Sequence, residues 1–96
     1  MEKGRLPAMN LRDWCLSQID FEEELLFADG FDEAILGLTY QNGHSIVLYD
    51  RDRCLRTLVD RDDMTFTEAL EFFECNVQGS YFGPKTPLFV TMPCDN

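Results

Sequence analysis

The stretch from Tyr49 to Val90 constrains the fold more than any other part of this chain. It contains the sharpest helix start in the sequence, because Thr65 is followed three residues later by Glu68, the pattern of a capping box. Further on, Pro84 and Pro87 exclude both a helix and a central strand. The segment therefore predicts a capped helix, a specified loop and a return to a sheet.

A β-hairpin is predicted just before this stretch. Residues 34–40 and 45–49 are rich in Ile, Val, Leu and Tyr, and Asn42-Gly43 lies between them. Asn-Gly is the strongest short hairpin signal because both residues tolerate positive φ. Asp50 is expected to end the second strand and to cap a helix that breaks at residues 60–63. Residues 88–92 are expected to form a third strand that joins the hairpin.

The N-terminal third is predicted to be helical. Residues 1–9 are expected to be a loose leader, and Asn10 to cap a short helix that ends near Gln18. A second helix is predicted from Asp20 to Gly30, with Phe21 on its buried side. These elements give a small single α+β domain over residues 10–96, in the order α-α-β-β-α-α-β, with the hairpin and third strand packed against helices.

The helix after Thr65 supplies much of the expected core. Phe66, Ala69 and Phe73 recur at helical spacing and are predicted to face inward. Gly79 is predicted to end this helix in a left-handed conformation. The four cysteines are scattered without a CxxC pair, which favours buried, reduced thiols over zinc ligands or disulfides.

The composition limits the partners. The chain of 96 residues carries a net charge of −10, a field that repels free nucleic acid and anionic membranes and favours basic proteins. It has no apolar run of the roughly 20 residues that a membrane span needs. The first residues lack the apolar stretch of a secretory signal, so a soluble cytoplasmic protein is expected.

No motif for catalysis or for a cofactor is complete. The loop from Gly79 to Thr86 differs from a phosphate-binding loop, because Pro84 removes an N–H where phosphate would be held. The acidic turn that starts at Asp60 lacks the glycine and later oxygen ligands of a calcium loop. His44 is placed at the tip of the hairpin, a poor site for a general base. We therefore expect no enzyme, no cofactor and no metal.

Two features nevertheless indicate a contact surface. Glutamates recur every third residue along the capped helix, and Asp13–Glu33 contains eight acidic residues and no basic one. Such an array either imitates the charge of DNA or is the solvated side of amphipathic helices. Aromatic residues on the helix and the following loop either pack or contact a partner. The candidate partner-binding residues are Glu68, Glu71, Phe72, Glu74, Asn76, Tyr81, Phe82 and Thr86.

Residues 31–90 resemble a family of short, uncharacterised bacteriophage and prophage proteins. The family pattern is an aliphatic residue before YD-x-x-K-C-I, then M-(S/T)-x-E-E-A-x-E-(Y/F)-F-E-(F/Y)-N, then G-(A/S)-(Y/W)-x-G-x-x-T-P-x-F. The matching positions are Tyr49, Asp50, Cys54, Met64, Glu68, Ala69, Glu71, Phe73, Asn76, Gly79, Tyr81, Gly83, Thr86, Pro87 and Phe89. Arg53 replaces lysine, Thr67-Glu68 an acidic pair and Cys75 an aromatic residue. The resemblance implies a phage-related origin, within a bacterial host cell, and no known activity.

These observations favour a non-catalytic protein-binding module whose partner is basic or binds nucleic acid, and which is directed at the host or imitates nucleic acid. One alternative is an enzyme or metal-dependent accessory protein, which requires Asp50, Asp62 and Asn76 to converge in one pocket. Another is a structural domain that forms oligomers. The oligomeric state is open at this point.

Overall fold

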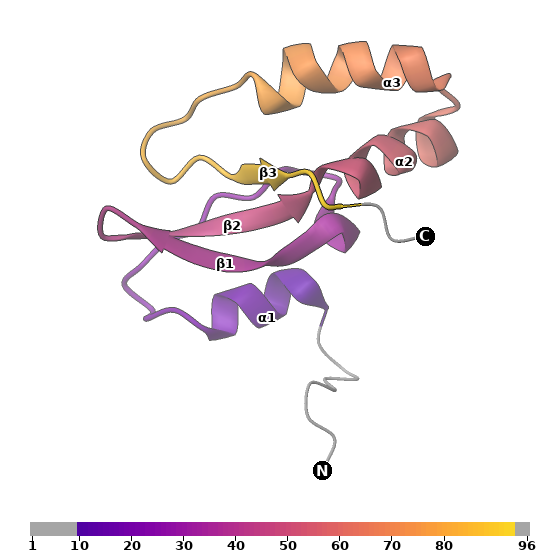
Figure 1. The fold of residues 1–96 in the computed structure, drawn as a ribbon. Helices are drawn as coiled ribbons and strands as arrows, with labels where there is room; N and C mark the ends of the chain where they lie inside the picture. Colours follow the sequence, from indigo (N-terminus) through magenta and orange to yellow (C-terminus); the bar gives the residue numbers. More distant parts are fainter. Residues whose placement is uncertain (1–9, 94–96) are drawn as a thin grey trace.

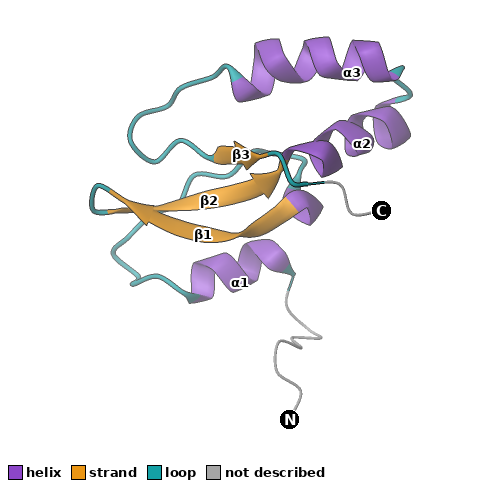
Figure 2. Ribbon diagram, in the orientation of Figure 1, coloured by secondary structure: helices purple, strands orange, loops and turns teal. Residues whose placement is uncertain are grey.

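The computed structural model describes residues 10–93, so the leader expected over residues 1–9 and Cys94 lie outside the described part. Helices and strands are both present, which confirms the α+β class (Figures 1 and 2). The elements are α1 (Leu11–Ser17), the 3-10 turn η1 (Asp32–Ala34), β1 (Ile35–Gln41), β2 (His44–Asp50), α2 (Arg51–Asp62), α3 (Phe66–Phe73), the π-helical turn η2 (Glu74–Gln78) and β3 (Leu88–Val90).

The predicted hairpin is confirmed. Strands β1 and β2 pair antiparallel, with Gln41 opposite His44. The two residues between them, Asn42 and Gly43, have φ of 54° and 82°. A turn with positive φ at both positions matches the right-handed twist of the flanking strands, so this two-residue sequence sets the register of the hairpin.

Strand β3 joins the hairpin as predicted and makes the sheet mixed. The strand order is β1-β2-β3, and β3 runs parallel to β2 with Leu48 opposite Leu88. A parallel neighbour requires a long crossover, which here contains α2, α3 and the loop that follows them. The crossover returns the chain to the sheet beside β2, where Figure 1 shows β3 between β2 and α3.

Both predicted helix starts in the crossover are confirmed. The Asp50 side chain accepts a hydrogen bond from the Arg53 N–H at 3.3 Å and caps α2. At α3, Glu68 N donates to Thr65 Oγ1 at 3.1 Å, and Thr65 N donates to Glu68 Oε1 at 2.9 Å. This reciprocal pair is the predicted capping box, and it satisfies two backbone donors that the helix itself leaves unpaired.

An aromatic stack forms the centre of the core. The ring of Phe73 meets Phe31 and Phe89 edge to face, at centroid distances of 6.2 and 5.0 Å. The Phe89 ring also stacks on Tyr49 at 5.3 Å. These four residues come from the segment before η1, from α3, from β3 and from β2, so the stack ties the sheet to the crossover.

The helix predicted from Asp20 to Gly30 is wrong. After one turn, in which Glu23 N donates to Asp20 O at 2.9 Å, the chain runs without regular structure. Figure 2 shows this segment crossing behind the sheet before η1. Phe21, expected to be buried, is 95% exposed. We call residues 19–30 the strap; its backbone groups bond to distant residues instead of to a helix.

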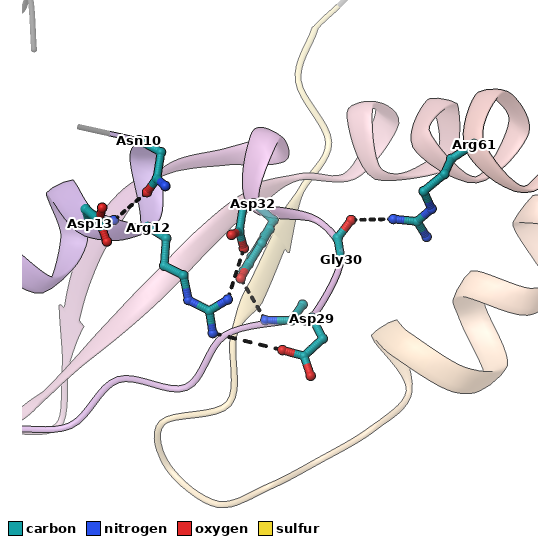
Figure 3. Close-up of polar contacts among 9 residues, drawn as sticks. Asn10, Arg12, Asp13, Asp29, Gly30, Asp32 and Arg61 are labelled. Atoms are coloured by element: carbon teal, nitrogen blue, oxygen red, sulfur yellow. Dashed lines mark hydrogen bonds and ion pairs between the residues drawn. The ribbon is translucent and has the colours of Figure 1, made fainter. Parts of the chain in front are cut away.

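Three contacts replace helical hydrogen bonds in the strap. The Ala28 N–H donates to the Tyr49 hydroxyl at 2.7 Å, and Lys85 Nζ donates to the Glu24 carbonyl at 2.9 Å. Arg61 Nη1 donates to the Gly30 carbonyl at 2.7 Å (Figure 3). Because buried backbone groups need partners, these tertiary bonds make an extended strap as acceptable as a helix.

Two expectations about α3 and one about the cysteines also need correction. Phe66 is 60% exposed, because the buried side of α3 begins at Ala69, one turn later. Gly79 has φ of −80° and so is not left-handed; a Cβ there would lie 2.8 Å from the Glu74 carbonyl oxygen. Cys15 and Cys54 are buried as expected, but Cys75 is exposed.

Candidate functional site

The outward side of α3 carries two of the predicted glutamates without an opposite charge. Glu68 and Glu71 are exposed, and neither forms an ion pair within residues 10–93. Phe72, 40% exposed, lies on the same side, since residues three and four apart are neighbours on a helix. We call Glu68, Glu71 and Phe72 the α3 stripe. It presents two carboxylates beside an aromatic ring.

Glu74, the third predicted glutamate, does not belong to this stripe. Its Oε2 lies 2.9 Å from Nη2 of Arg51, the first residue of α2. Arg51 Nε also donates to Gln78 Oε1 at 3.0 Å, so this arginine joins the start of α2 to the end of η2. The role of Glu74 is therefore to hold the crossover together. The Glu74 carboxylate, although 56% exposed, would therefore have to share Arg51 with a partner.

A cavity of about 450 Å³ opens at the other end of α3. It lies between the strap, η2 and the loop before β3, segments that are far apart in the sequence. Its lining is mainly apolar: Leu26, Phe27, Ala28, Phe31, Val77, Phe82, Pro87 and Phe89. The polar lining residues are Asp29, Asn76, Ser80 and Thr86. Concave, largely apolar sites with few polar groups are the usual form of binding sites.

Thr86 shapes the loop wall of this cavity. Its Oγ1 accepts a hydrogen bond from the Phe82 N–H and donates one to the Gly83 carbonyl, both at 2.7 Å. Gly83 has φ of 99°, a conformation that favours glycine. These bonds close residues 82–86 into a tight turn and hold Phe82, which is 69% exposed, at the cavity.

Asn76 connects the cavity to the α3 stripe. Its side-chain amide donates to the Phe72 carbonyl at 3.1 Å, one turn back along the helix. The Asn76 carbonyl in turn accepts a hydrogen bond from Ser80 Oγ at 3.1 Å. Asn76, which lines the cavity, therefore lies one helical turn after Phe72, the last residue of the stripe. Tyr81, 76% exposed, does not line the cavity; it lines an adjoining depression beside Ile46, which shares Ser80, Thr86 and Pro87 with the cavity.

The strap wall of the cavity was missed by sequence reasoning, because residues 20–30 were assigned to a helix. The run Leu25-Leu26-Phe27-Ala28 argues against an amphipathic helix here. On a helix, four consecutive apolar residues would point in all directions and could not all lie on one buried face. In the structure all four are partly buried, and the strap places them between core and cavity.

Arginines anchor the acidic N-terminal part. Arg12 of α1 lies 4.0 Å from Asp29 and 3.5 Å from Asp32 (Figure 3), and its guanidinium covers the Phe27 ring at 4.4 Å. Arg61 of α2 lies over the Phe31 ring at 5.6 Å. Cations above aromatic faces are attracted to them, so these two arginines fix rings that line the cavity.

The residues of the enzyme alternative do not converge. Asp50 and Asp62 stand at opposite ends of α2, a 12-residue helix and so about 18 Å long. The Arg61 guanidinium hydrogen-bonds Asp62 at 3.1 Å and lowers the pKa of that carboxyl group. Asn76 lies in η2, and within residues 10–93 no cluster of three His, Cys, Asp or Glu side chains is placed to hold a metal ion.

The buried titratable groups are held in their neutral forms. Burial raises the pKa of Tyr49 to about 12 and that of the Cys54 thiol to about 12, with Asp50 adding to the second shift. Burial also raises the pKa of Cys15. A thiol must lose its proton to act as a nucleophile, so these two cysteines have the properties of core residues.

No protein-family model, curated protein or solved structure matches this chain. Among the described residues, none of the helices is long and apolar enough to cross a membrane.

Proposed function

We propose that this protein is a non-catalytic binding module of a phage or prophage and that its partner is a basic protein of the bacterial host. The phage assignment rests on the resemblance of residues 31–90. The binding role rests on one observation: within residues 10–93 the α3 stripe carries two carboxylates that form no ion pair, with an exposed aromatic ring beside them.

The stripe suits protein contact on physical grounds. A face built only for helix stability gains from mixed charges, whereas Glu68 and Glu71 repel each other at a spacing of three residues. Phe72 offers apolar area of the kind that dominates interface energies. Two carboxylates around such a ring favour a lysine- or arginine-bearing surface.

The net charge of −10 supports the same partner class. A field of this sign speeds the approach of a basic protein and opposes nucleic acid or an anionic membrane. Basic surfaces are typical of proteins that bind nucleic acid, so such proteins are included among the partners. Steering by exposed charge weakens as salt is added.

The test uses charge-neutral variants of equal size. Glu68→Gln with Glu71→Gln removes two charges and keeps the α3 cap, since glutamine also completes a capping box. The matched control is Asp13→Asn with Glu33→Gln, which removes two exposed charges outside α3, one in α1 and one in η1. Helix α1 lies on the opposite side of the sheet from α3 (Figure 1). Tagged proteins are used to capture partners from host lysate at low and high salt.

We expect wild type and control to capture the same basic protein at low salt, and the Glu68/Glu71 variant to lose it. High salt should release it from the wild type and the control. Capture that is insensitive to salt, or equal losses in the variant and its control, would contradict the proposal. A wild-type protein that captures nothing would contradict it as well.

A further inference from the structure

We propose that the cavity between the strap, η2 and the loop before β3 receives one aromatic side chain of the partner, from a segment with lysine or arginine on both sides of it. This inference rests on the proposed function and names the part of the partner that the surface recognises. The α3 stripe and the cavity then bind the partner together: the stripe recognises its charge, and the cavity recognises the shape of its aromatic side chain.

The lining of the cavity fits an aromatic ring. Phe27, Phe31, Phe82 and Phe89 come from three separate segments and surround the same space. Aromatic rings attract one another edge to face or offset, in addition to the effect of buried area. Phe82 is largely exposed, so its ring loses contact with water when the cavity fills. Aromatic anchors in such pockets are typical centres of protein interfaces.

The walls are also held in place before binding. Phe31 and Phe89 both pack edge to face on Phe73, which is fully buried. Thr86 closes the turn that carries Phe82. A cavity with fixed walls needs little ordering when a ligand enters, and this preserves affinity.

Charge around the cavity selects the flanking residues of the ligand. Asp29 is the charged side chain in the lining, and its 4.0 Å ion pair with Arg12 leaves it 95% exposed; Glu22, Glu23 and Glu24 precede the strap wall in the sequence. Lys85 keeps its charge while its Nζ donates to the Glu24 carbonyl, but it is not in the cavity lining and lines another depression with Asp20, Glu22 and Glu23. An aromatic residue between cations matches this setting. A second copy of this chain, with its net charge of −10, is opposed by repulsion.

The first test titrates isotope-labelled full-length protein with three amidated tripeptides and follows backbone amide NMR shifts. Lys-Trp-Lys should move the amides of Ala28, Val77 and Phe82. Lys-Ala-Lys keeps the charge and lacks the ring, whereas Glu-Trp-Glu keeps the ring and reverses the charge; both should leave these amides nearly unmoved. Equal shifts with Lys-Trp-Lys and Lys-Ala-Lys, or shifts confined to the α3 stripe, would overturn the inference.

The second test fills the cavity. Ser80→Trp places an indole at a lining position, and Ser17→Trp places the same group on exposed α1 as the control. We expect Ser80→Trp to weaken Lys-Trp-Lys binding about tenfold and Ser17→Trp to leave it unchanged. Phe82→Ser removes the exposed ring that forms one wall of the cavity, and it should also weaken Lys-Trp-Lys binding. This variant replaces Ser80→Trp in the test if Ser80→Trp does not fold. Unchanged affinity in the folded variant would overturn the inference.

The two proposals fail in distinguishable ways. If Ser80→Trp still captures the basic partner, the cavity is not where the partner docks, and the proposed function stands. If the wild-type protein captures no partner, the proposed function falls, while the tripeptide titration still reports directly on the cavity. Capture that is lost in Ser80→Trp and kept in Ser17→Trp supports both.

Discussion

Gly79 ends the π-helical turn at a position where a side chain does not fit. The Glu74 carbonyl oxygen would lie 2.8 Å from a Cβ, and that oxygen belongs to the backbone and cannot move away cheaply. The φ of −80° is one that any residue adopts. Close approach, and not backbone conformation, therefore requires glycine here.

Gly79→Ala should lower the free energy of unfolding by about 1–3 kcal/mol, since it overpacks a turn held by the backbone. Gly79→Asn should lower the free energy of unfolding at least as much. Asparagine tolerates a left-handed backbone better than alanine does, but its Cβ would meet the same carbonyl oxygen. Urea unfolding of both variants measures this. A cheap asparagine beside a costly alanine would indicate positive φ and contradict the steric account.

The Tyr49 hydroxyl is the other residue-scale feature with a measurable consequence. It accepts the Ala28 N–H at 2.7 Å, and Tyr49 is fully buried. Tyr49→Phe leaves that donor without its acceptor and should lower the free energy of unfolding by roughly 1–3 kcal/mol. Unfolding by urea at neutral pH, compared with the exposed Tyr40→Phe, tests it; equal stability of the two variants would refute the role of the hydrogen bond.

The same group predicts alkaline destabilisation. The pKa of Tyr49 rises from its ordinary 10.0 to about 12, so above pH 10 the unfolded chain loses a proton that the folded chain keeps. The stability that Tyr49 contributes should therefore be full below pH 10 and be lost progressively up to about pH 12. The pKa of Cys54 rises from 9.0 to about 12, so Cys54 adds a decline in stability that begins near pH 9. Thermal unfolding between pH 8 and pH 12 checks the slope, and Tyr49→Phe should flatten its upper part.

Among the elements, the strap depends most on distant contacts. The Glu24 carbonyl accepts a hydrogen bond from Lys85, 61 positions away along the chain, and the Ala28 N–H donates to Tyr49, 21 positions away. Elements of this kind open locally at lower free energy than the core, because few contacts hold them. Its stability is therefore set by single side chains.

Lys85→Met removes the donor to Glu24 and keeps the apolar stem of the side chain. We expect a loss of about 1 kcal/mol in local stability, in the range of a net hydrogen bond. Amide hydrogen exchange should become faster at Leu25–Ala28 and stay unchanged in the middle of α2. Lys85→Arg retains a donor and is the control; faster exchange throughout the molecule would contradict a local role.

The sequence predicted those elements whose causes are local. The Asn42-Gly43 turn and the Thr65–Glu68 cap depend on neighbours in the chain, and both are confirmed. The strap could not be predicted this way, because its hydrogen bonds depend on Tyr49 and Lys85, which only the fold brings near. The cavity could not be predicted for the same reason. The sequence pattern of the loop does indicate Asn76, Phe82 and Thr86, but not the strap residues that line the cavity with them.

At the scale of the whole molecule, charge dominates. Folding confines a net charge of −10 in a small volume, and this self-repulsion opposes compaction. Added sodium chloride screens it, so the thermal midpoint should rise with salt. A falling midpoint would show that ion pairs such as Arg51–Glu74 outweigh the repulsion.

The same net charge predicts a monomer. Sedimentation at low salt measures the oligomeric state, and a dimer there would favour the alternative of a structural domain that forms oligomers.

The parallel pairing of β3 has a consequence for the order in which the protein is made. Leu88 follows its partner Leu48 by roughly forty positions, so the ribosome releases the hairpin well before β3. Until then Phe89 is absent, and the rings of Tyr49 and Phe73 lack the residue that joins them. Until β3 is made and pairs with β2, the nascent chain therefore leaves uncovered the apolar surface of Tyr49 and Phe73 that Phe89 covers in the folded protein.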